Sequence, residues 1–188
     1  MLSTTVIETP LSILLIDATE NAEGWEWDVS QRLVTVLGKR GVGLVGDGLF
    51  ALMDGNDLAR LADQLATASC IVLLGSANNS RERLLNTWDW LLANVEGPKL
   101  AVACHWGAPD SQLTDAVLGS TASWAPIAIA QETNVLPREG ALFLLKFLTE
   151  MDLHSTDRIT GRMAWFAWKK AGELLKRRRM NARFGLRT

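Results

Sequence analysis

The stretch that decides the fold is Leu100-Ala101-Val102-Ala103-Cys104-His105-Trp106-Gly107, an apolar run that reaches a thiol and then a turn glycine. A continuous apolar run of this kind is typical of a strand that is buried on both faces of a parallel sheet. In open α/β folds, ligands and reacting groups lie at the carboxyl ends of such strands. Cys104 is therefore either a small core residue or a nucleophile, and the choice depends on whether a base can reach the thiol.

The rest of the chain alternates between strand-like and helix-like patterns. Three further apolar runs predict strands and a weaker one lies between glycines: Ser12–Ile16, Cys70–Leu74, Pro126–Ala130 and Val42–Val45. Helical periodicity predicts helices between them, over Val29–Lys39, Asp57–Thr67, Arg81–Val95 and Pro137–Met151. Such alternation builds βαβ units. We expect a three-layer α/β sandwich over residues 1–154, with a mostly parallel sheet of about five strands.

Composition narrows the class of protein. The 188 residues are 48% hydrophobic and 21% charged, which are values of a globular chain. The first ten residues lack the pattern of a secretion signal. Cys70 and Cys104 each lie in or beside a strand-like run, which predicts reduced thiols in a cytoplasmic protein. Because the two cysteines and two histidines lack paired spacing, we expect no metal site and no cofactor.

Charge is unevenly distributed along the chain. Residues 156–188 hold ten of the 19 lysines and arginines and only two of the 21 acidic residues. Ser155–Arg179 is predicted to be one long helix, with an apolar stripe formed by Ile159, Met163, Phe166 and Leu174 and widened by Trp165, Trp168 and Leu175. Met180–Thr188 is predicted to be a frayed basic tail. The chain is thus expected to consist of an α/β domain followed by a basic amphipathic unit over residues 155–188.

The basic run Lys176–Arg179 has three interpretations. It is a solvated helix end, a helix that docks on a protein partner, or a contact with anionic lipid or nucleic acid. The aromatic stripe on the preceding turns favours a protein partner, because an exposed apolar face needs a cover. We expect no specific nucleic-acid binding and at most a weak contact with an anionic surface, while the oligomeric state is left open.

Only two histidines could serve as a base for Cys104. His105 is adjacent in sequence, and successive residues of a strand point to opposite faces, so it reaches the thiol only if the chain has already turned. His154 follows the predicted helix from Pro137 and is expected at the opposite end of the sheet from the strands' carboxyl ends. His105 is therefore a weak candidate base.

Two segments resemble the CHAT domains, which are caspase-like proteins related to separase. Ala103, Cys104 and Gly107 match the family's catalytic-cysteine strand, an apolar run that ends in Ala-Cys-x-Ser-Gly or a similar motif. Trp124–Gln131 and the helix from Pro137 are similar to the family's closing strand and following helix. The resemblance implies a caspase-like sheet, close to the flavodoxin-like arrangement, with Cys104 in the nucleophile's position.

In that family, the histidine of the catalytic dyad closes the preceding apolar strand. Here that strand is Ile71–Ala77, which puts Ser76 where the histidine would stand. The resemblance therefore implies a degenerate domain that acts as a regulatory or protein-interaction module without catalysis. The alternative is an active cysteine peptidase in which Cys104 uses His105 or a partner's histidine.

A second resemblance is to TIR domains. Asp54–Leu58, the helix after it and the strand that ends at Ser76 are similar to the middle of that family. Members that cleave NAD use a glutamate on the helix after this strand, and Glu82 is the residue that this helix offers. The resemblance implies a signalling or NAD-cleaving domain as a further alternative.

Overall fold

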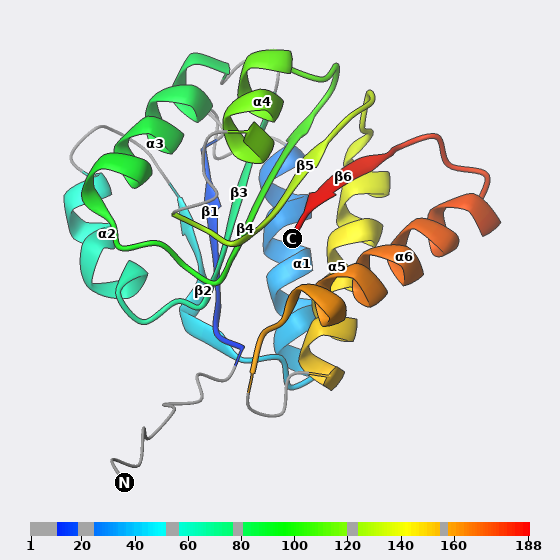
Figure 1. The fold of residues 1–188 in the computed structure, drawn as a ribbon, viewed down its shortest axis with the longest axis horizontal. Coiled ribbons are helices and arrows are strands. Elements are labelled where there is room, and N and C mark those ends of the chain that lie inside the picture. Colours follow the sequence, from blue (N-terminus) through cyan, green and yellow to red (C-terminus); the bar gives the residue numbers. More distant parts are fainter. Residues whose placement is uncertain (1–10, 19–24, 52–56, 77–80, 120–123, 155–157) are drawn as a thin grey trace, which may run out of the picture.

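The computed structural model describes residues 11–18, 25–51, 57–76, 81–119, 124–154 and 158–188, and it contains a six-stranded sheet with helices on both faces (Figure 1). The strands are β1 (Ile13–Asp17), β2 (Leu44–Ala51), β3 (Cys70–Ser76), β4 (Leu100–Trp106), β5 (Ile127–Gln131) and β6 (Phe184–Arg187). Their order across the sheet is β2-β1-β3-β4-β5-β6. The first five strands are parallel, and β6 pairs with β5 in the antiparallel sense.

In the described residues, six helices form the two outer layers. They are α1 (Trp25–Lys39), α2 (Asp57–Leu65), α3 (Arg81–Asn94), α4 (Ser111–Gly119), α5 (Pro137–His154) and α6 (Gly161–Arg177). One hydrophobic core joins the sheet to α1, α5 and α6, and the other joins it to α2, α3 and α4. The α/β class with a mostly parallel sheet is therefore confirmed, with one strand more than predicted.

The central strand β4 explains why its sequence is apolar without interruption. All seven of its residues are buried. Leu100, Val102, Cys104 and Trp106 belong to the core under α1 and α5, whereas Ala101 and Ala103 belong to the opposite core. Each face of the sheet thus receives alternate residues of the same strand.

The prediction of a frayed tail was wrong. Phe184–Arg187 form β6, which closes the sheet against β5. The ring of Phe184 stacks on Phe143 of α5, with centroids 3.9 Å apart. The indole Nε1 of Trp168 in α6 donates to the carbonyl oxygen of Phe184, at 2.7 Å. Four residues are too few to show the alternation of apolar and polar side chains that marks a strand. The strand is held instead by β5, α5 and α6, which are packed against it in space.

Three other elements differ from expectation. The weak strand predicted over Val42–Val45 corresponds to β2, which begins at Leu44 and is longer than predicted. The short helix α4 was not predicted. The long helix predicted over Ser155–Arg179 is interrupted before α6. Residues 158–160 are not helical, and Thr160 caps α6 by accepting from the amide of Met163 at 3.3 Å. The start predicted at Ser155 lies outside the described residues.

The buried face of α6 shares only Leu175 with the predicted stripe. It consists of three alanines and one leucine, Ala164, Ala167, Ala171 and Leu175. Among the predicted stripe residues, Ile159, Met163 and Leu174 are only partly buried, and Phe166 is 37% exposed. Small side chains at a helix contact let the two axes approach closely, and α6 uses alanines to pack on α5 in this way.

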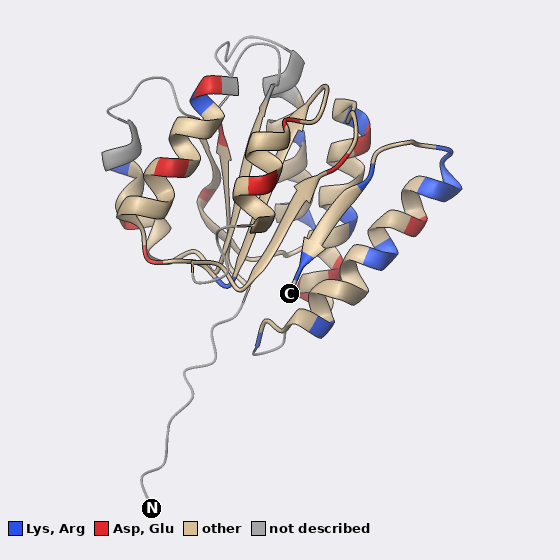
Figure 2. Ribbon diagram, turned by 45° about the horizontal axis from the view of Figure 1, so that its top comes forward, with Lys and Arg blue, Asp and Glu red and all other residues tan. Residues whose placement is uncertain are grey.

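Basic residues line the outer side of α6 and the turn after it (Figure 2). The exposed rings of Trp165 and Phe166 lie among them, with Lys169 Nζ 5.1 Å from the centre of the first ring and Lys170 Nζ 5.3 Å from the second. In the described part of the chain, no helix combines the length and the apolar character needed to cross a bilayer.

Substitution of Phe184 tests whether β6 belongs to the core. Phe184→Ala is expected to lower the free energy of unfolding by about 3–5 kcal/mol, because a buried aromatic ring and its stacking partner lose their contact. Urea denaturation followed by circular dichroism measures this change. The exposed Arg177→Ala should stay within about 0.5 kcal/mol of the parent. A Phe184→Ala variant as stable as that control would indicate a detached tail.

Candidate functional site

Cys104 lies inside the molecule and not at the end of its strand. It is the fifth of seven residues in β4, and only 1% of it is exposed. The first turn of α5 covers it at Gly140, where an added Cβ would lie 3.2 Å from Cys104 Sγ and 2.4 Å from the Trp106 ring. Only glycine permits this close approach of the α5 backbone to β4.

The chemistry of the thiol follows from this burial. Desolvation raises the pKa of Cys104 well above that of an ordinary thiol, because the thiolate would have to form away from water. The same cause raises the pKa of Cys70. Since the thiolate is the reactive form, Cys104 is held as an inert thiol near neutral pH.

His105 faces away from Cys104 because β4 continues through it as a regular strand. The ring is buried between β5 and the start of α4. Its backbone N–H donates to Gln131 Oε1 at 2.8 Å, and its Nε2 accepts from the backbone N–H of Asp110 at 3.3 Å. Its Nδ1 lies 3.5 Å from Gln131 Nε2, so both ring nitrogens face polar groups of β5 and of the residue before α4. The structure therefore does not bring this candidate base to the thiol.

The bond from Asp110 to His105 also organises α4. Asp110 Oδ1 accepts from the amides of Gln112 and Leu113, at 2.9 and 3.2 Å, and so caps the helix. His105 thus holds the residue that starts α4. Sequence reasoning missed this arrangement, although an aspartate followed by apolar residues at Leu113 and Val117 is a recognisable helix start.

The remaining candidate residues lie on separate elements. Ser76 is the last residue of β3 and pairs in register with Trp106, while Cys104 pairs with Leu74. The side chain of Ser76 lies outside what the structure describes. His154 is the last residue of α5, and Glu82 is an exposed residue in the first turn of α3. Among the described residues, no cluster of histidine, cysteine or acidic side chains is suited to a metal ion.

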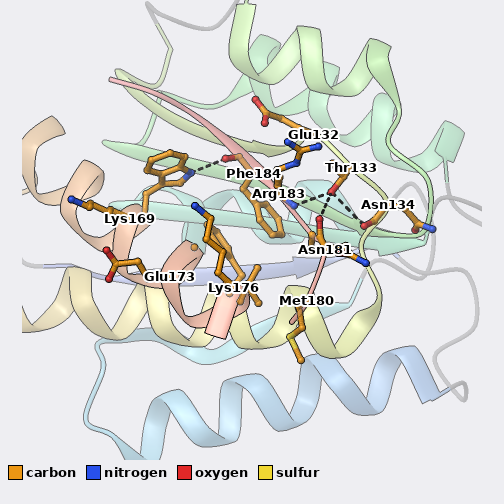
Figure 3. A pocket seen from close by; sticks show the side chains of 15 residues that line it. Glu132, Thr133, Asn134, Lys169, Glu173, Lys176, Met180, Asn181, Arg183 and Phe184 are labelled. Atoms are coloured by element: carbon orange, nitrogen blue, oxygen red, sulfur yellow. Dashed lines mark hydrogen bonds between the residues drawn. The ribbon is translucent and has the colours of Figure 1, made fainter. Parts of the chain in front are cut away.

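A groove of about 830 Å³ lies elsewhere, between α6, residues 180–184 and the loop after β5 (Figure 3). Phe143, Leu175 and Phe184 form its apolar base, and Trp168, Lys169, Gly172, Glu173 and Lys176 line it from α6. The opposite wall carries Glu132, Thr133, Asn134, Asn181 and Arg183, and Met180 and Ala182 complete the lining. This concave site was not predicted, because no pattern in the sequence indicates that β6 exists.

The wall opposite α6 is held by hydrogen bonds. The backbone N–H of Arg183 donates to Thr133 Oγ1 at 2.8 Å, and that of Asn181 donates to Glu139 Oε1 at 3.0 Å. The other oxygen of Glu139 accepts from the amide of Leu136 at 3.0 Å, which secures the start of α5. The groove is therefore a formed feature of the fold.

The close approach at Gly140 can be tested against a second helical glycine. Gly140→Ala should destabilise the protein by about 1–3 kcal/mol, because the added methyl group meets the Trp106 ring. Gly172→Ala should stabilise it by about 0.5–1 kcal/mol, because a Cβ there meets nothing within 4 Å. Urea denaturation of both variants measures the difference. Equal effects would contradict the packing described at Gly140.

Stability should depend on pH through His105. Burial lowers the pKa of His105 from its usual 6.5, and the nearby Asp110 offsets part of that effect. The unfolded chain therefore binds the proton at a higher pH than the folded one, so the free energy of unfolding falls as the pH drops below about 6.5. His105→Gln keeps an acceptor but does not titrate, and should weaken this dependence between about pH 7 and pH 5.

Chemical denaturation at several pH values provides the measurement. His154→Gln is the matched control, because it removes the other histidine of the chain and should leave the slope unchanged. A His105→Gln variant with the parent's slope would mean that His105 is not the responsible group.

The sequence was compared with known proteins. No protein-family model matches it, and a search of curated proteins finds no significant match.

Proposed function

We propose that this chain is a caspase-like domain of the CHAT type that lacks the dyad histidine and acts as a protein-interaction module without catalysis. The observation that carries the proposal is the burial of Cys104 under α5. A protonated thiol with no base on its own face of β4 cannot attack a peptide bond at a useful rate. Cys104 occupies the nucleophile's position in the family, but the described residues supply no base that could deprotonate its thiol.

The sheet topology is in keeping with the resemblance to this family. β3 and β4 are adjacent parallel strands, with Leu74 opposite Cys104 and Ser76 opposite Trp106. Positions 76 and 104, to which the resemblance assigns the dyad, therefore lie on neighbouring strands. A serine hydroxyl does not accept a proton near neutral pH as imidazole does, so position 76 supplies no general base.

The surface of α6 supports the interaction role. Trp165 is 49% exposed, and cations stand over its ring and that of Phe166. Residues 158–188 contain ten lysines and arginines and a single acidic residue, Glu173. An apolar and basic surface of this kind favours an acidic protein partner, because long-range attraction and aromatic burial then act together. Both cysteines are free, which supports a reducing compartment such as the cytoplasm.

Thiol labelling tests the lack of catalysis. In a Cys70→Ala variant, Cys104 is the only thiol. Its reaction with a disulfide reagent should be about a hundredfold or more slower in the native protein than in urea, because the thiol must first be uncovered. The rate should also rise with pH, as expected of a protonated thiol.

Two outcomes would overturn the proposal. One is rapid, stoichiometric labelling that does not vary with pH near neutrality, which would indicate an accessible thiolate. The other is hydrolysis of a peptide library by the parent protein that is lost in Cys104→Ala.

A further inference from the structure

We infer that the groove between α6 and residues 180–184 binds an acidic peptide segment of a partner protein, one that carries a large apolar side chain. This inference rests on the proposed interaction role, and it assigns that role to a definite site. The groove is distinct from the surroundings of Cys104, which lie beneath α5.

The base of the groove suits a large apolar side chain. Phe143 and Phe184 stack face to face below it, and Leu175 continues the apolar surface. Trp168 forms part of the α6 wall, and its indole is fixed by the hydrogen bond to the Phe184 carbonyl. Aromatic side chains that are held in place before binding are typical anchors of interfaces, since little rotamer freedom is lost.

The charges of the groove favour an acidic ligand. Lys169 and Lys176 line it from α6, and Arg183 lines it from the opposite wall (Figure 3). Glu132 and Glu173 also line it, so cations outnumber carboxylates by three to two. The exposed arginines at 177–179 lie at the carboxyl end of α6 and add positive charge nearby. This field would attract acidic residues on both sides of the apolar anchor.

Side-chain amides supply the polar contacts that a peptide backbone needs. Asn134 and Asn181 line the same wall as Arg183. Each amide can donate to a carbonyl and accept from an N–H. The backbone N–H groups of Arg183 and Asn181 bond to Thr133 and Glu139, which fixes the stretch of backbone that carries Asn181.

Gly172 provides an independent argument for an occupant. It lies in the interior of α6 and lines the groove, and a Cβ built on it meets nothing within 4 Å. Glycine is a poorer helix former than alanine, and no neighbour among the described residues requires it. A ligand backbone that approaches the helix closely at this position would require it.

The experiment begins with a random peptide library displayed on phage and selected on the full chain. Enriched peptides are synthesised with a fluorescent label, and their dissociation constants are measured by anisotropy. We expect them to be rich in acidic residues around an aromatic or large aliphatic residue. Gly172→Ala should already weaken binding several-fold, because its methyl group meets the ligand backbone, and Gly172→Trp should weaken binding by about tenfold or more by filling the groove.

Charge reversal provides a second variant that does not depend on how Gly172→Trp folds. Lys176→Glu combined with Arg183→Glu alters two exposed side chains of the groove and should also weaken binding by about tenfold. Circular dichroism and urea denaturation establish that each variant is folded.

The inference is overturned if no peptide is enriched, if the enriched peptides lack an acidic bias, or if the folded groove variants bind as the parent does. If Trp165→Ser abolishes binding and the groove variants do not, the partner binds the exposed face of α6. That result would reject the groove as the binding site and leave the proposed interaction role standing. Rapid labelling of Cys104 would instead contradict the proposed function and leave the groove result unaffected.

Discussion

The close contact between α5 and β4 at Gly140 is the constraint on which the rest of the structure depends. It brings the helix backbone onto Cys104 and Trp106, and it places Phe143 of the next turn where β6 can stack on it. The alanine face of α6 then packs on the outside of α5. The packing of α5 on β4 thus covers the thiol and supplies Phe143 to the base of the groove.

The central part of the fold could be predicted from sequence because its signals are local. β4 and β3 are continuous apolar runs, and burial on both faces is sufficient to produce such a pattern. β6 could not be predicted in this way. Its four residues include a glycine and an arginine, and it is a strand because β5, Phe143 and Trp168 hold it.

The candidate site was predictable in position but not in chemistry. The sequence placed Cys104 near the carboxyl end of a central strand, and β4 in fact continues for two residues beyond it. That extension turns His105 to the other face and buries the thiol beside Trp106. A glycine four residues into a helix gives no hint of which strand it will contact, so the cover over Cys104 became visible only in three dimensions.

The last strand also joins the two outer layers through the sheet. Phe184 packs into the layer of α5, while the Arg187 guanidinium donates to the carbonyl oxygens of Leu118, in α4, and Ala125 on the other side. β6 therefore contacts both helical layers, through Phe184 on one face of the sheet and Arg187 on the other. Displacement of β6 would thus break contacts on both faces of the sheet, at Phe143 of α5 and at Leu118 of α4.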